Sequence, residues 1–192
     1  MLNSSDRYGW LAKTFHWLTA LAIVGMFPFA WWMTELKLGP QMLEMYGLHK
    51  SVGILVLTVT ALRLGWRFVN PKPRFLGGPV WQRWASDIVH FGLYVCLIAI
   101  PLIGLLHSNA ANFPVSVFGI VTMPQLIAPD RALVEPLQEA HEIAGIVLLV
   151  LLGLHVAGAL KHHLFDKDAT LRRMLPFAAA SSSAAPERHD AE

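Results

Sequence analysis

The chain has 192 residues, of which 55% are hydrophobic and only 15% charged, and its mean hydropathy is +0.48. Soluble globular proteins carry about 25% charged residues, so a soluble domain of this composition would leave large apolar patches in water. The formal net charge of +2 argues against a nucleic-acid-binding surface. The single cysteine, Cys96, excludes an intramolecular disulfide and a paired-cysteine metal motif. The composition therefore predicts an integral membrane protein with nine histidines.

Four apolar segments are long enough to cross a bilayer, which needs about 20 residues. Residues 14–34 and 143–160 contain no charged side chain, and the uncharged stretch 88–129 is long enough for one span and an apolar loop. The remaining segment, 48–68, carries cations only near its ends, where long side chains can reach the headgroups. We therefore expect an all-α, four-helix membrane bundle with helices over residues 13–34, 47–68, 87–107 and 139–164.

Two segments lie outside these spans. Residues 109–138 form the one long connection, and their FPVSVFGIV run is too short to cross the membrane, so we expect it to lie in the interface as a cap. Residues 177–192 are rich in alanine and serine and carry several charges, which is typical of a disordered tail. Residues 1–176 are therefore expected to form a single transmembrane domain.

The distribution of lysine and arginine predicts the orientation of the bundle. One side holds only Lys37, Lys50 and Arg131. The other twelve of the 15 cations fall on the opposite side, near the termini and in the connection between the second and third spans. The positive-inside rule then places both termini in the cytoplasm.

Four histidines recur at matching depths in the expected bundle. His16 begins the first span at the inner side, and His49 begins the second at the outer side. His141 begins the fourth span at the outer side, and His155 follows it by 14 residues, a rise of roughly 21 Å that returns to nearly the same helix face. His141 is thus level with His49, and His155 with His16.

Two histidine pairs at two depths of a four-helix bundle are what two b-type haems require as axial ligands. A small residue follows each of these histidines one turn later, which leaves clearance for a macrocycle against the helix. These residues are Ala20, Gly53, Gly145 and Ala159. Small residues are common in membrane helices, so this second pattern supports the haem interpretation without deciding it.

Other interpretations of the histidines were weighed against this one. A zinc or copper site needs ligands that converge in one small cavity, which histidines at two depths do not provide. The adjacent His162 and His163 could bind a surface metal, but solvated interface histidines are the favoured explanation. His90 is interpreted as a packing residue or as a partner of a ligand, and His107 and His189 are not expected to form a site. A non-redox membrane protein with packing histidines remains the control hypothesis.

Several stretches resemble the prokaryotic cytochrome b561 family of small dihaem membrane proteins, over about residues 8–176. The most specific is the last, which joins a histidine, a double histidine and a short basic end. The stretches are FHWLTAL, LHKSVGILVL, VHFGLYVCLIAIPLIGLL, FGIVTMP, QEAHEIAG and GLHVAGALKHHLFDKDATLRRMLP. The resemblance implies two haem b groups, with the axial ligands His16, His49, His141 and His155.

The resemblance also implies electron transfer to ubiquinone and, in one branch of the family, oxidation of superoxide at the outer face. With both axial positions filled, such haems transfer electrons without binding dioxygen. Arg63 and Arg67 are candidate partners of the haem propionates. His162 is the candidate quinone contact, through a hydrogen bond or proton transfer.

The predicted outer surface argues against an anionic donor such as superoxide. Acidic residues outnumber the three cations there, which leaves Lys50 and Arg131 as the candidate local guides for an anion. Two functions therefore stay open: a superoxide:ubiquinone oxidoreductase, and an electron-transfer module that docks a periplasmic dehydrogenase or carrier protein. The acidic residues are Glu35, Glu44, Asp130, Glu135, Glu139 and Glu142.

Overall fold

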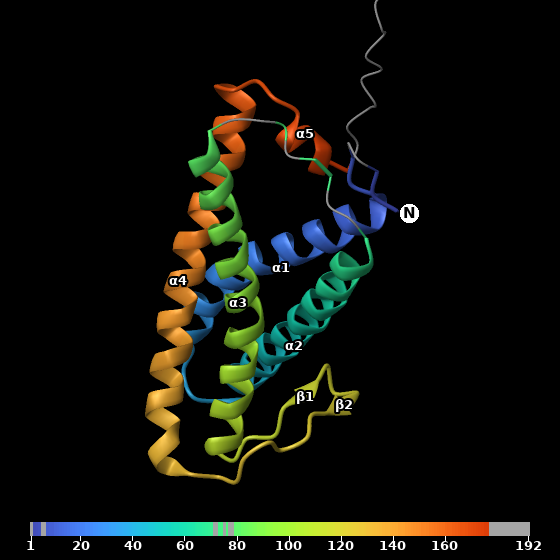
Figure 1. The fold of residues 1–192 in the computed structure, drawn as a ribbon. Helices are drawn as coiled ribbons and strands as arrows, with labels where there is room; N and C mark the ends of the chain where they lie inside the picture. Colours follow the sequence, from blue (N-terminus) through green and yellow to red (C-terminus); the bar gives the residue numbers. More distant parts are fainter. Residues whose placement is uncertain (1, 5–6, 71–72, 75, 77–78, 177–192) are drawn as a thin grey trace, which may run out of the picture.

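The computed structural model describes residues 2–4, 7–70, 73–74, 76 and 79–176, and within them four long helices form an up-and-down bundle (Figure 1). Each of the four is long and apolar enough to cross a membrane, as predicted. A short fifth helix follows them, and two short strands pair in the connection before the fourth. The helices are α1 (Trp10–Thr34), α2 (Pro40–Val69), α3 (Val80–Ala110), α4 (Arg131–Leu164) and α5 (Thr170–Met174), and the strands are β1 (Ser116–Val117) and β2 (Val121–Thr122).

Three helices begin seven or eight residues earlier than the sequence predicted. The prediction followed charge-free runs, which report only the part of a helix that lies in hydrocarbon. α2 instead starts at Pro40, a residue suited to the first turn of a helix, and α4 starts after Asp130, whose carboxylate accepts a hydrogen bond from Ala132 N at 2.9 Å. α3 also continues through Pro101 to Ala110 instead of ending near His107.

The two ends of the bundle differ in what covers them. At one end, here called the terminal end, α1 begins, α2 ends, α3 begins and α4 ends beside α5. At the other, the hairpin end, β1 and β2 lie next to the first turns of α2 (Figure 1). α3 and α4 pack most extensively against each other, and most side chains of the four spans face outward from the bundle. The expected tail, residues 177–192, lies outside the described residues.

The predicted interfacial cap is a folded β-hairpin. β1 pairs with β2 in antiparallel register, Ser116 with Thr122, and the turn holds Phe118 and Gly119 at φ of 50° and 73°. A side chain at positive φ is strained, so the surrounding structure must hold Phe118 in place. Val115 anchors the hairpin in a small core with two helical residues, Ile54 and Leu105.

Ser51 fastens this hairpin to α2. Its buried hydroxyl accepts a hydrogen bond from Phe118 N at 2.9 Å and lies 3.2 Å from Ser116 O. Because Ser51 stands two residues after His49, the hairpin is tied to the helix turn that carries one of the predicted ligands.

Substitution of Ser51 by alanine is expected to loosen the hairpin. The change leaves the Phe118 amide without its acceptor, which costs about 1–3 kcal/mol in a buried setting. We expect faster hydrogen exchange across residues 113–123 and a lower midpoint of thermal unfolding. Thr58→Ala is the matched control, since its hydroxyl bonds only to Ile54 O within the same helix. Equal exchange in the two variants would show that Ser51 does not hold the hairpin.

Candidate functional site

The histidine pair at the hairpin end comes from α2 and α4. The ring centroids of His49 and His141 lie 6.1 Å apart, with an angle of 64° between the ring planes. The His141 Nδ1 lies 3.1 Å from the backbone oxygen of Ile100, and donation to that oxygen leaves the Nε2 lone pair for a metal. The buried Nδ1 of His49 has no hydrogen-bond partner among the described residues. Both rings therefore have a nitrogen available for a ligand bond.

The pair at the terminal end comes from α1 and α4 and has the same geometry. His16 and His155 also lie 6.1 Å apart between centroids, at 64°. A third ring, His90 of α3, packs against His155 at 5.1 Å, and its Nδ1 lies 3.2 Å from Ser86 Oγ. The structure thus brings together all four predicted ligands, two by two, and adds His90 to one pair.

Both separations fit a shared metal ion. Two imidazoles on opposite sides of one metal, each bonded at about 2.0–2.1 Å, place their centroids about 6.3 Å apart. The rings of His90 and His155 meet edge-on like the other two pairs, but their centroids lie only 5.1 Å apart, which is too close for two imidazoles on opposite sides of one metal. The structure therefore favours His16 over His90 as the partner of His155.

Two glycines beside the hairpin-end pair are not required by helix packing. A Cβ at Gly145 would meet nothing within 4 Å, and one at Gly53 would reach only Pro101 Cβ at 3.9 Å. Open space next to the histidines is consistent with a flat group lying against these helices. Gly104 is different, because a Cβ there would come within 3.2 Å of the His141 ring. Gly104 therefore makes room for the His141 imidazole itself.

Two arginines of α2 form a cationic cluster near the terminal-end pair. The guanidinium carbons of Arg63 and Arg67 lie 5.4 and 5.5 Å from the centre of the Tyr94 ring. Within the described residues, neither forms an ion pair with a carboxylate. Burial raises the pKa of the neighbouring Tyr8, although Arg67 and Arg63 oppose that rise. A half-buried cationic cluster without an acidic partner is suited to binding an anionic group.

Arg63 also contacts one of the predicted ligands. Its Nη2 donates to the Nδ1 of His16 at 3.2 Å. A neutral imidazole that accepts at Nδ1 carries its proton on Nε2, so this hydrogen bond must break before His16 can bind a metal through Nε2. Ligand binding at His16 would then release the Arg63 guanidinium for another acceptor.

The double histidine near the end of α4 is divided between two environments. His163 is exposed, whereas the His162 Nδ1 contacts Asp168 Oδ2 at 2.7 Å and Asp166 Oδ2 at 3.1 Å. These three side chains could also converge on a cation, but Lys161 already pairs with Asp166 at 2.6 Å. The contact with Asp168 orients the His162 ring and leaves Nε2 for a ligand.

Asp168 also starts the short helix α5. Its Oδ1 accepts a hydrogen bond from Thr170 N at 2.7 Å. Burial alone would raise the pKa of Asp168, but the hydrogen bonds from Thr170 and His162 outweigh it and lower the pKa below its usual value. Asp168 therefore remains a carboxylate at neutral pH and couples the His162 ring to the position of α5.

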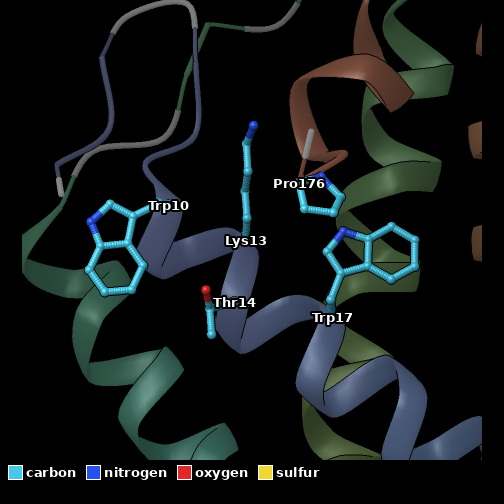
Figure 2. A pocket seen from close by; sticks show the side chains of 5 residues that line it. All are labelled: Trp10, Lys13, Thr14, Trp17 and Pro176. Carbon is cyan, nitrogen blue, oxygen red and sulfur yellow. The ribbon is translucent and has the colours of Figure 1, made fainter. Parts of the chain in front are cut away.

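A cavity of about 360 Å³ lies where the end of α5 meets α1 (Figure 2). Trp10 and Trp17 stand on either side of it, Lys13 and Thr14 lie between them on α1, and Pro176 faces Trp17. Lys13 Nζ donates to Leu175 O at 2.9 Å and Trp17 Nε1 to Met174 O at 2.8 Å, so two lining residues also fasten the end of α5. His162 is not among the described residues that line this cavity.

The hairpin-end surface carries few cations. Lys50 is half-buried with its ammonium 5.6 Å from the centre of the Phe113 ring, and Arg131 is exposed at the start of α4. The six predicted acidic residues at this end are exposed: Glu35, Glu44, Asp130, Glu135, Glu139 and Glu142.

Four apolar spans with two stacked histidine pairs define a multi-pass membrane protein of the cytochrome b type. The comparison with known families agrees, because the model of the prokaryotic cytochrome b561 family matches residues 7–177. The chain belongs to the prokaryotic cytochrome b561 family, and it is therefore a membrane cytochrome that binds haem b.

Individual relatives cover nearly the whole chain. It is 37% identical to cytochrome b561 homolog 2 of Escherichia coli (strain K12), over 90% of this chain and 93% of the relative. It is 29% identical to the probable superoxide oxidase CybB of Yersinia pestis, over 88% and 96% of the two chains. It is also 28% identical to cytochrome b561 homolog 1 of Escherichia coli (strain K12), over 84% and 92%.

Proposed function

We propose that the protein is a dihaem cytochrome that oxidises superoxide at its hairpin end and reduces ubiquinone at its terminal end. The main support is that two histidine pairs at different depths along α4 have the same geometry. In each pair the ring centroids lie 6.1 Å apart and the ring planes form an angle of 64°. His141 and His155 are separated by roughly 21 Å of helix, which places the two pairs near opposite faces of a hydrocarbon core about 30 Å thick.

Each histidine pair would hold one haem b, which supplies one-electron transfer when bound. His49 and His141 would ligate the group at the hairpin end, and His16 and His155 the group at the terminal end. Arg63, released from His16, and Arg67 would bind propionates through charge-assisted hydrogen bonds. Two histidines bound to each iron would favour electron transfer over oxygen binding.

We propose that the terminal end faces the cytoplasm and the hairpin end the periplasm of a bacterial inner membrane. The described cations support this orientation, since nearly all of those outside the spans lie at the terminal end. Two superoxide anions would each give up one electron at the hairpin end and leave as dioxygen. At the terminal end, one quinone would take up these two electrons and two protons to become quinol.

His162 is the proposed proton donor to the reduced quinone. It lies seven residues beyond His155, so it falls on nearly the same face of α4, about 10 Å further toward the terminal end. The contact of Nδ1 with Asp168 orients the ring and directs Nε2 away from the carboxylate. A positioned imidazole next to the reduction site is a common arrangement for general acid catalysis at neutral pH.

Lys50 and Arg131 are expected to guide superoxide to the hairpin end. The variant Lys50→Gln/Arg131→Gln should reduce the rate of haem reduction by superoxide several-fold and weaken its dependence on ionic strength. Electrostatic steering is screened over a Debye length of about 8 Å at physiological salt. Stopped-flow spectroscopy at several salt concentrations measures both effects, and haem content should stay unchanged. Glu35→Gln/Glu139→Gln is the opposite-charge control and should raise the rate.

The six exposed carboxylates favour a second candidate function. They form a surface suited to a cationic or protein donor, so the protein would then receive electrons from a periplasmic dehydrogenase or carrier. Faster haem reduction by superoxide after removal of Lys50 and Arg131, or no salt dependence, would contradict steering and favour this docking module. A reduced-minus-oxidised spectrum without b-type haem bands would contradict both functions and favour a non-redox membrane protein.

A further inference from the structure

We propose that Trp66 and Asn70, at the end of α2, complete the binding site for the two propionates of the terminal-end haem, together with Arg63 and Arg67. This inference rests on the proposed function, which places a haem at the terminal-end pair. It adds two residues that the sequence did not single out. It also connects the haem site with the N-terminal residues, because Asn70 contacts both.

α2 carries an unusual set of buried polar atoms. Within the described part of the chain, every buried side-chain nitrogen or oxygen that lacks a hydrogen-bond partner belongs to α2 or to the residue that directly follows it. These atoms are His49 Nδ1, Thr60 Oγ1, Trp66 Nε1 and Asn70 Nδ2. Buried polar atoms are rarely left unpaired, because they lose their hydration without a replacement. One of the four belongs to a predicted haem ligand, so an unpaired atom of α2 can mark a place that a bound group fills.

Two of these unpaired atoms lie on the same helix face as the arginines. In chain order the four residues are Arg63, Trp66, Arg67 and Asn70, at the spacing i, i+3, i+4 and i+7. This spacing places them within an arc of about 100°. Asn70 is only 2% exposed and Trp66 is half-buried. One face of α2 therefore carries four donor groups, and the two guanidiniums form no ion pair with a described carboxylate.

This set of donors matches two carboxylates in charge and in hydrogen bonding. Two guanidiniums balance the charges of two propionates, and the indole and amide N–H groups can each add a hydrogen bond to a carboxylate oxygen. The end of α2 carries about half a negative elementary charge from the helix dipole, which two full positive charges outweigh. Because Arg63 contacts His16, the donor groups begin beside a ligand of the terminal-end pair. They are thus suited to the acidic groups of a haem held by that pair.

Asn70 also holds the N-terminal residues. Its Oδ1 accepts a hydrogen bond from Asn3 N at 3.1 Å, and the Asn3 Oδ1 accepts one from Gly9 N at 2.7 Å. Tyr8, which precedes Gly9, interacts electrostatically with both arginines. The two polar atoms of the Asn70 amide therefore have different roles, since Oδ1 orders the N-terminal residues and Nδ2 is left for a propionate. Binding at Nδ2 should also stabilise the N-terminal residues.

The first experiment measures the rate at which the holoprotein loses its terminal-end haem to apomyoglobin, and the reduction potential of that haem. Trp66→Phe keeps an aromatic ring but removes the N–H group, so haem loss should be about tenfold faster. The potential should fall, because a propionate charge with one donor fewer favours the ferric state. Trp81→Phe is the matched control, since Trp81 is exposed near the start of α3 at the same end of the bundle. It should behave like the unmodified protein.

Two variants of Asn70 separate haem binding from a purely structural role. Asn70→Asp keeps the acceptor for Asn3 but replaces the donor by a negative charge, whereas Asn70→Ala removes both. We expect at least tenfold faster haem loss in both variants, with the larger effect in Asn70→Asp. Asn109→Asp is the matched control, because Asn109 is also buried and also accepts from a backbone N–H, but at the hairpin end. It should leave the terminal-end haem unchanged.

An effect confined to one of the two Asn70 variants would overturn the assignment of Asn70. If only Asn70→Ala lost haem faster, Asn70 would act by holding the N-terminal residues. If only Asn70→Asp did so, the new charge would merely compete for Arg67. Normal haem loss in Trp66→Phe would likewise remove Trp66 from the site while leaving dihaem binding intact.

Hydrogen exchange gives a second readout that does not depend on electron transfer. N-terminal peptides should exchange more slowly in the unmodified holoprotein than in His16→Ala, which is expected to lack the terminal-end haem. In Asn70→Ala the same peptides should exchange as fast as in His16→Ala, and equal exchange in all three proteins would contradict the connection through Asn70. An unmodified protein that binds no haem at the terminal-end pair would instead contradict the proposed function itself.

Discussion

Substitution of either histidine of one pair by alanine is expected to remove one haem and spare the other. His49→Ala and His141→Ala should each lose about half of the bound haem, because only one of the two histidines that would hold that haem remains. His16→Ala and His155→Ala should lose the other half. Haem content by the pyridine haemochrome assay gives the amount, and a redox titration identifies which of the two components is missing.

His163→Ala serves as the control for this series, since that histidine is exposed beside the site. His90→Ala should also retain both haems, because its ring lies only 5.1 Å from that of His155, too close for two imidazoles on opposite sides of one iron. Full haem content in all four ligand variants would sink the assignment. Loss of the hairpin-end component from a folded His16→Ala protein would show that the histidines are paired differently.

Replacement of His162 by glutamine is expected to slow the re-oxidation of reduced haem by quinone by about a hundredfold. General acids contribute about 10²- to 10⁴-fold to proton-transfer steps, and glutamine cannot supply a proton. Reduction of the haem by superoxide should not change, because it takes place at the other end of the bundle. Stopped-flow traces with each reactant separate the two steps, and His163→Gln is the neighbouring control.

Asp168→Asn should slow the same step less, because the ring keeps its proton but loses its orienting carboxylate. The pKa of Asp168 is lowered in the folded protein, so its contribution to stability is complete above the unfolded value of about 3.9. That contribution disappears only as the pH falls through the still lower folded value. A pH profile of the quinone step between 5 and 8 therefore contains no titration of Asp168. Equal rates for His162→Gln and His163→Gln would contradict the role of His162.

The sequence was sufficient to predict the four spans and the two histidine pairs. Both depend on regular helix geometry, so the 14-residue spacing of His141 and His155 carries directly into the structure. Helix starts were less accurate, because hydropathy does not register polar turns such as the one that begins at Arg131. Sequence spacing also left open that His90 packs on His155, since the rotation of α3 depends on tertiary contacts.

The contacts that short segments make with distant residues could not be predicted from the sequence. The hairpin was expected as an apolar stretch in the interface, but it is held against α2 by Ser51, which is 67 residues away from Phe118 in the sequence. The contact of His162 with Asp168 depends on a turn that has no periodic pattern. The cavity on α1 had a signal, the spacing of Trp10, Lys13, Thr14 and Trp17, but that pattern is also typical of an interfacial aromatic belt. The cavity could be recognised only from the structure, which places Pro176 opposite Trp17 (Figure 2).

Because both histidine pairs share α4, this helix sets the relation between them. Inserting a single residue between His141 and His155 would rotate everything that follows by about 100° and turn His155 away from His16. Most substitutions on the outward-facing surface of the same segment leave that relation unchanged, since they alter only what meets the lipid. Natural length variation in relatives should therefore be confined to the connections, such as residues 35–39 and 124–130, while the interval 141–155 keeps a constant number of residues.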